Sequence, residues 1–261
     1  MKHSIITAAL LFLMASCQKV IDLKVKDASP KYVIEGNITN LPGPYTVTLS
    51  RTTPFNTSWE FQGVGGATVT IGDNMGNSET LQESQTGIYQ TTGLTGVEGR
   101  TYALHITVGG QTFTASSTMP PLVRFDSLYI RELVNFTKTV KAAVPVFTDP
   151  KGQGNAYRFN QYINGRLDKG LYYQNDDFTD GLTNSFALLQ PDPDSTLHVN
   201  DRVEIDMQCI DKAVYEYWFS LDQSSKGDGN GIPANPVSNI QGGALGYFSA
   251  HTSQRRSLLV K

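Results

Sequence analysis

Short segments in which apolar and polar residues alternate recur along most of the chain, and this pattern predicts β-strands joined by turns. In the N-terminal half the clearest examples are PYTVTLSRT (44–52), GATVTIGDNMGN (66–77) and TYALHITVGG (101–110). Gly109-Gly110 favours a two-residue hairpin turn, because glycine accepts the positive φ values that such turns need. Pro120-Pro121 then interrupts the pattern. We therefore predict a first β-sandwich module over residues 30–120.

The C-terminal half repeats the strand pattern. Alternating runs occur at VRFDSLYIRE (123–132), AYRFNQYINGRLD (156–168) and DRVEIDMQCID (201–211). Asn164-Gly165, inside the second of these runs, is a strong signal for a tight hairpin. These runs predict a second β-rich module over residues 121–261.

One segment has helical periodicity instead. In DKAVYEYWFSLDQSS (211–225), Val214, Trp218 and Leu221 lie at i, i+4 and i+7 and form one apolar stripe. Asp211 is a suitable N-cap. We predict a mostly β protein with two β-sandwich-like modules, in which this helix packs on the second module and Trp218 lies in the core.

The N-terminus has the pattern of a targeting segment. In MKHSIITAALLFLMASCQK, Lys2 precedes an apolar run that is too short to span a bilayer, and small residues lead to Cys17. Residues 13–17, LMASC, resemble a bacterial lipobox, which implies cleavage after Ser16 and acylation of Cys17 by diacylglycerol and a fatty acid such as palmitate. Residues 1–16 would be the signal peptide and 17–29 a lipidated tether. The alternative is an ordinary secreted protein in which Cys17 occurs by chance.

Composition narrows the classes of function. The chain has 261 residues, a net charge of −3 and no cluster of basic residues, so we expect no nucleic-acid partner. Apart from Cys17 it has one cysteine, Cys209, which lies in an alternating strand pattern and is predicted to be a buried free thiol. The four histidines are too scattered to complete a zinc site with these cysteines.

The sequence contains one candidate for a catalytic pair, and its pattern does not favour catalysis. Ser249 and His251 lie close together in FSAHTS. In a strand, residues i and i+2 share a face, but we do not expect them to be held at hydrogen-bonding distance, and no nucleophile-elbow motif accompanies them. We predict that the protein is not an enzyme.

Acidic loops offer a weak candidate for a metal. YYQNDDFTDG (172–181) contains Asp176, Asp177 and Asp180, and calcium prefers such carboxylate oxygens on a flexible loop. The spacing does not match an EF-hand. Calcium is therefore one of three interpretations, beside a solvated turn and contact with a charged partner.

Aromatic residues offer a second type of ligand site. Tyr172, Tyr173, Trp59 and Phe61 are candidates for stacking on sugar rings, provided that they are exposed. The alternative is that they pair across strands, which explains most aromatic residues in a β-rich chain.

The run SSKGDGNGIPANPVSNIQGGALGYFSA (224–250) is rich in glycine and asparagine. It lacks the lysine position of a phosphate-binding loop and the further acids of a calcium loop. We predict a flexible turn over 227–231, followed by a closing strand whose glycines permit close backbone approach. Asn235 and Asn239 are candidates for partner or ligand contact.

Several segments together carry a resemblance to known families. CQKVIDL (17–23), YVIEGNITN (32–40), QCIDKAVYEYW (208–218) and ANPVSNIQGGALGYFSA (234–250) resemble an uncharacterised family of outer-membrane lipoproteins from Bacteroidota, often encoded beside TonB-dependent receptors. The first module is similar to transthyretin-like, carboxypeptidase-regulatory sandwiches, which usually serve as spacers or docking bodies.

The resemblance implies placement and partners but no activity. We expect a protein anchored in the outer membrane, on its periplasmic or its cell-surface face, that acts as a non-enzymatic accessory or binding component of a TonB-dependent uptake system. The partners would be membrane lipid, a TonB-dependent receptor, and a glycan or other nutrient. The alternative is a stand-alone surface protein whose binding depends on a glycan or on calcium.

Overall fold

The computed structural model describes residues 30–53, 61–135, 138–192, 195–226 and 235–261. The predicted signal peptide, Cys17, the tether, Trp59 and the turn at 227–231 lie outside the described residues. Among the described residues, no helix combines the length and the apolar character that a membrane crossing requires.

Eight strands form the N-terminal part of the fold. They are β1 (Tyr32–Thr39), β2 (Thr46–Arg51), β3 (Thr68–Asp73), β4 (Ser78–Thr80), β5 (Gln82–Gln85), β6 (Ile88–Gln90), β7 (Thr101–Val108) and β8 (Gln111–Thr118).

The C-terminal part adds further strands and one helix. They are β9 (Phe125–Asn135), β10 (Lys138–Thr148), β11 (Ala156–Ile163), β12 (Arg166–Leu167), β13 (Tyr172–Asn175), β14 (Thr183–Asn184), β15 (Arg202–Ile210), α2 (Lys212–Lys226), β16 (Ile240–Gln241) and β17 (Leu245–Leu259).

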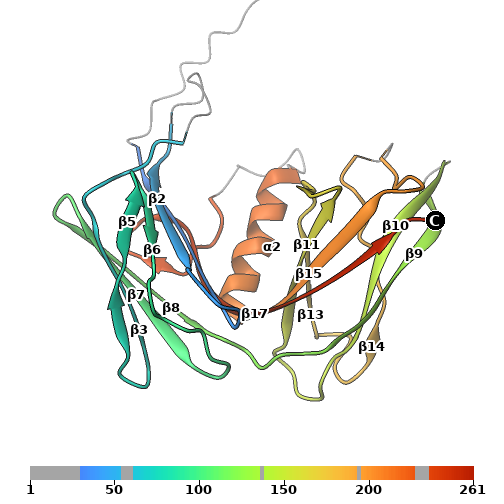
Figure 1. The fold of residues 1–261 in the computed structure, drawn as a ribbon, viewed down its shortest axis with the longest axis horizontal. Coiled ribbons are helices and arrows are strands. Elements are labelled where there is room, and N and C mark those ends of the chain that lie inside the picture. The colour runs from blue at the N-terminus through green and yellow to red at the C-terminus, as the bar shows by residue number, and fades with distance from the viewer. Residues whose placement is uncertain (1–29, 54–60, 136–137, 193–194, 227–234) are drawn as a thin grey trace, which may run out of the picture.

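A nine-stranded sheet runs through the whole molecule in the order β12-β11-β15-β17-β1-β2-β6-β5, with β13 also paired to β11 (Figure 1). A five-stranded sheet, β16-β8-β7-β3-β4, packs on its N-terminal half and encloses the first core. A three-stranded sheet, β14-β10-β9, packs on its other half and encloses the second core. The prediction of a mostly β protein with two sandwich-like modules is confirmed.

The helix lies where the sequence predicts it. α2 begins one residue later than expected and packs on β11, β13 and β17. Val214, Trp218 and Leu221 all belong to the cluster beneath it, and Trp218 is only 8% exposed, so its predicted place in the core is confirmed. Asp211 caps the helix, because its Oδ1 accepts a hydrogen bond of 2.9 Å from the amide of Val214.

Asp211 also ties the helix to the first module. Its Oδ2 accepts hydrogen bonds from the hydroxyl of Ser117 and, at 3.0 Å, from the amide of Thr118 at the end of β8. One carboxylate therefore fixes both the start of α2 and its position against the N-terminal half of the molecule.

Local turn chemistry agrees with the sequence. Asn164 and Gly165 have φ values of 52° and 77°, and Gly109 and Gly110 have 56° and 76°. These are the left-handed conformations that a type I′ hairpin turn requires at both central positions. Both predicted hairpins, β11–β12 and β7–β8, are confirmed.

The C-terminal strand β17 is shared between the two halves. Residues 245–251 pair in parallel with β1, and residues 252–259 pair antiparallel with β15. β16, just before it, pairs with β8. The boundary at residue 120 stays a prediction, but the end of the chain contributes strands to both sides of it.

Close approach at Gly246 makes this sharing possible. Its φ is 98°, and a Cβ there would lie 1.9 Å from the carbonyl oxygen of Ile34 in β1. Ile34 is fully buried in the first core. The prediction that glycine permits close backbone approach in the closing strand is confirmed at this position.

We predict that Gly246→Ala lowers the free energy of unfolding by about 3 kcal/mol or more, because it adds a backbone clash to the strain of a positive φ. Gly243→Ala is the matched control, since Gly243 has a φ of 86° but open space around its Cβ position. It should cost about 1–2 kcal/mol, the strain alone. Urea unfolding of both variants measures the difference, and equal losses would contradict the proposed contact.

Candidate functional site

A pocket of about 330 Å³ lies beside the first turns of α2. It is bounded by the helix, by the loop that precedes β11 and by the end of β13 with the residues that follow. Its polar lining consists of three amides, three acids and a lysine, beside one tyrosine: Gln153, Asn155, Asn175, Asp176, Asp177, Glu216, Lys212 and Tyr215. This is the small, concave type of site that binds ligands of limited size.

Asp176 holds the two loops of the pocket together. Its carboxylate accepts hydrogen bonds from the amide of Gly154, at 2.8 Å, and from the amide of Asn155, at 2.9 Å. The backbone amide of Asp176 donates in turn to the carbonyl of Asn155. The loop before β11 is therefore fixed to the end of β13, and the pocket lies between this pair and α2.

An aromatic cluster forms the helix side of the pocket. Tyr215 and Phe219 lie one helical turn apart with nearly parallel rings, and Tyr173 from β13 meets both of them edge-on. The hydroxyl of Tyr173 donates to the buried carboxylate of Asp222 at 2.7 Å. Partial burial, with the nearby negative charge of Asp177, raises the pKa of Tyr215, so its hydroxyl stays protonated.

The structure gives different surroundings to Tyr172 and Tyr173, the two adjacent ligand candidates from the sequence. Tyr173 supports the ring of Tyr215 from behind the pocket, whereas Tyr172 packs against the second core and donates its hydroxyl to Asp168. Successive residues of a strand point to opposite faces of the sheet, so these two could not line one site. Tyr172 therefore lies away from this pocket, and Tyr173 contributes to it only through its contact with Tyr215.

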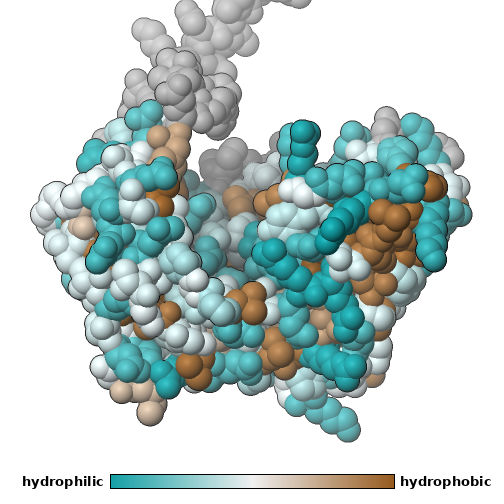
Figure 2. Space-filling model, in the orientation of Figure 1, coloured by the Kyte–Doolittle hydropathy of each residue, from teal (hydrophilic) through white to brown (hydrophobic). Residues whose placement is uncertain are grey.

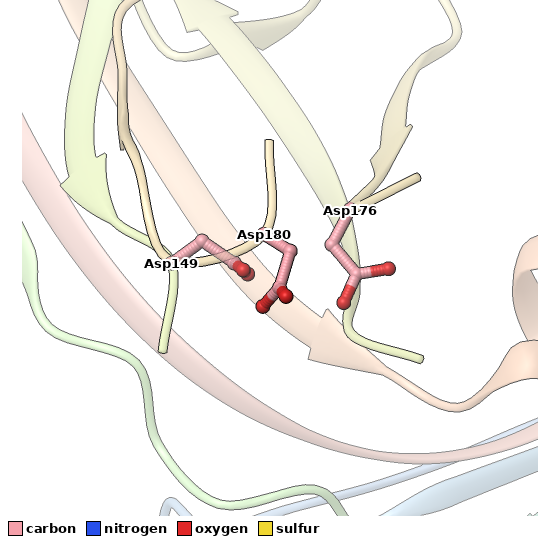
Figure 3. Close-up of side chains that lie close together, drawn as sticks. All are labelled: Asp149, Asp176 and Asp180. Carbon is pink, nitrogen blue, oxygen red and sulfur yellow. The ribbon is translucent and has the colours of Figure 1, made fainter. Parts of the chain in front are cut away.

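Three carboxylates converge close to the pocket (Figure 3). Asp149, Asp176 and Asp180 each place an oxygen within 4.8 Å of the others, and the first two are buried. They could offer oxygens to a cation of the calcium type, which takes six to eight such ligands. Of the three acids named from the sequence, Asp176 and Asp180 join this cluster. Asp177 instead accepts a hydrogen bond from Asn175 at 2.6 Å.

Asp149 could not be found from the acidic run alone. It follows β10, far from the other two in sequence, and folding brings β10 beside β14 and its preceding loop. Its carboxylate accepts hydrogen bonds from the hydroxyl of Tyr157 and, at 3.2 Å, from the amide of Gly181. Backbone amides thus already meet part of the hydrogen-bonding capacity of the cluster.

The expectation for Ser249 and His251 was wrong in one respect. The hydroxyl of Ser249 lies 2.9 Å from Nδ1 of His251, so the two side chains are hydrogen-bonded. The sheet holds them on one face of β17, where Ser249 is 1% and His251 3% exposed. A nucleophile buried to this extent offers no room for a substrate, so the pair is a structural feature of β17.

The asparagine candidates have different places. Asn239 donates from Nδ2 to the carbonyl of Phe248 at 2.7 Å and accepts at Oδ1 from the amide of Phe248 at 2.9 Å. Its amide therefore pairs with the backbone of β17 and is not available to a ligand. Asn235 and Phe61 are both exposed, and neither of them lines the pocket.

Figure 2 shows a second surface feature. Hydrophilic side chains cover most of the visible face, but apolar ones gather on the lobe formed by β9, β10 and the end of β17. Exposed apolar residues on these strands include Val134, which is 78% exposed, with Tyr129 and Leu259. Exposed apolar area of this kind often marks contact with another molecule.

Comparison with protein families assigns the chain to a family. A family model described as a domain of unknown function (DUF4249) matches residues 18–257, so the chain belongs to that family. A search of curated proteins found no match.

His251 makes stability depend on pH. Burial lowers its pKa from an ordinary value near 6.5 to about 4, an effect that Asp206 opposes and Arg158 reinforces. Between these two pH values the unfolded chain binds a proton that the folded protein does not, so stability falls as the pH is lowered from about 6.5 to about 4. We expect this histidine to contribute up to about 3 kcal/mol of that loss.

The comparison of His251→Asn with the parent isolates this contribution, because asparagine can keep a polar partner for Ser249 but does not titrate. Urea unfolding at pH 7 and at pH 4.5 should show a smaller loss for the variant than for the parent. His105→Gln, at an exposed position on β7, is the control and should behave like the parent. The same loss in His251→Asn as in the parent would contradict the assignment.

Proposed function

We propose that this chain is a lipid-anchored protein of the outer membrane in a Bacteroidota-type cell envelope, and that it serves a TonB-dependent uptake system as a non-enzymatic accessory or binding component. The observation that carries the proposal is the lipobox-like LMASC ending at Cys17. The segment up to Cys17 lies outside the family match, which covers residues 18–257.

Acylation would give a stable anchor. Each buried CH₂ group of an acyl chain contributes about 0.8 kcal/mol, and two or more chains hold a protein at a membrane. The tether of residues 17–29 would then connect the anchor to β1, so the folded body would be displayed close to the bilayer on one face of the outer membrane.

The two halves of the body would have different tasks. We assign the first module the role of a rigid docking body, as in transthyretin-like sandwiches. The second module supplies the surfaces that suit contact, which are the pocket beside α2 and the exposed apolar residues on β9 and β17. Burial of the Ser249–His251 pair supports a binding role over catalysis.

A second candidate is a stand-alone surface protein that binds a glycan or calcium without a receptor. The convergence of Asp149, Asp176 and Asp180 beside the pocket favours it, because Asp176 belongs to both features. The two candidates differ in one respect that can be measured, namely whether a receptor accompanies the protein.

We expect Cys17→Ser to move the protein from the membrane fraction to the soluble fraction, because the acylated sulfur is lost. Cys209→Ser is the matched control. Its thiol is buried and free, so its loss should leave the protein at the membrane. Cell fractionation with labelled palmitate measures both, and recovery of Cys17→Ser in the membrane with label would contradict the anchor.

The same strains, with an affinity tag on this protein, test whether it binds a TonB-dependent receptor. Mild-detergent purification of the parent and of Cys209→Ser should recover a TonB-dependent receptor. Recovery of this chain alone would argue against the accessory role and favour the stand-alone candidate.

A further inference from the structure

We infer that the pocket beside α2 is a saccharide-binding site, in which a neutral sugar ring stacks on Tyr215 and the amides of Asn155 and Asn175 bind its hydroxyl groups. This inference rests on the binding role proposed above, but on neither the lipid anchor nor the receptor.

The size and position of the pocket suit a saccharide. The volume of about 330 Å³ is at the lower end of the range for small-molecule sites. A second pocket of about 200 Å³ shares Asn155 and Lys212 with it and continues past Ile210 toward Pro120 and Pro121, between the two modules. Because they share lining residues, the two pockets are neighbours, and this arrangement suits a ligand of more than one sugar ring.

Tyr215 provides a prepared platform for the ring. Phe219 stacks beside it at 6.1 Å, and Tyr173 meets it at 5.7 Å with an interplanar angle of 73°. Because these neighbours restrain the ring, little side-chain freedom is lost when a ligand binds. The C–H groups on one face of a sugar are slightly positive and match the negative face of an aromatic ring.

Two amides are oriented by hydrogen bonds of their own. Asn155 donates from Nδ2 to the carbonyls of Gly152, at 3.0 Å, and Pro150, at 3.3 Å. Asn175 donates from Nδ2 to Asp177. The amide oxygens of Asn155 and Asn175 accept no hydrogen bond from any residue that the structure describes. Fixed acceptors of this kind suit the hydroxyl donors of a sugar.

Charge selects among hydroxyl-rich ligands. Asp176, Asp177 and Glu216 line the pocket, and Nζ of Lys212 lies 4.0 Å from Oε1 of Glu216. The excess of negative charge disfavours phosphates, sulfates and acidic sugars. Neutral saccharides are compatible with it. An organic ammonium ion would also be compatible, so the experiment must separate the two.

The test begins with the purified full chain in mild detergent, applied to an array of neutral, acidic and amino glycans. We expect binding to at least one neutral glycan. Titration calorimetry with that glycan should show at least about a tenfold loss of affinity for Tyr215→Ala. Tyr215→Phe keeps the stacking face and should lose less than about threefold.

Phe61→Ala, which removes an exposed aromatic ring away from the pocket lining, is the control and should bind like the parent. Unchanged thermal unfolding midpoints show that each variant is folded. Three results would each overturn the inference: no neutral glycan bound, binding of amino glycans alone, or equal affinity of Tyr215→Ala and Phe61→Ala. Membrane recovery of Cys17→Ser is read separately, so failure of the anchor and failure of the pocket are distinguishable.

Discussion

The rest of the structure depends on one strand that changes partners half-way along its length. β17 lies parallel to β1 over residues 245–251 and antiparallel to β15 over residues 252–259, so one chain segment forms part of both sandwiches. Its alternating side chains serve different layers, with Phe248 in the first core and Tyr247 beneath the helix. The close approach of Gly246 to Ile34 allows the pairing with β1. The side-chain amide of Asn239 forms two hydrogen bonds with the backbone of Phe248 and so fixes the start of the strand. Two modules that are consecutive in sequence are thereby joined by one continuous sheet.

The candidate site is a consequence of this arrangement. α2 directly follows β15, and Asp211 fixes its first turn against β8 of the other module. The helix can therefore present Tyr215 only toward the start of β11 and the end of β13, where Asp176 joins the two loops. Ligand sites tend to form where elements of different modules meet, and this pocket lies beside such a junction. The contact residues thus come from three elements around the sheet, with Tyr215 on α2, Asn175 at the end of β13 and Asn155 on the loop before β11.

Features that depend on neighbours in sequence could be predicted. The helix was visible from the spacing of Val214, Trp218 and Leu221, and the hairpin at Asn164-Gly165 from the φ values that its residues accept. Features that depend on strand order could not. The sequence gives no indication that Asp149 joins Asp176, or that the last strand pairs with the first. Tyr172 and Tyr173 are an intermediate case, because strand alternation already implied that they point to opposite faces of the sheet and could not share a site. Ser249 and His251 show the converse, since a shared face brought them into contact in a buried sheet.

If β17 joins both modules into one cooperative body, they should not unfold separately. Native-state hydrogen exchange followed by mass spectrometry, at increasing sub-denaturing concentrations of urea, tests this most directly, because it reports the opening free energy of each strand. We predict that backbone amides of β1 and β2 converge with those of β11 and β15 on a single opening free energy with the same dependence on urea. Two distinct values, with the strands before residue 120 opening while β11 and β15 stay protected, would contradict the account.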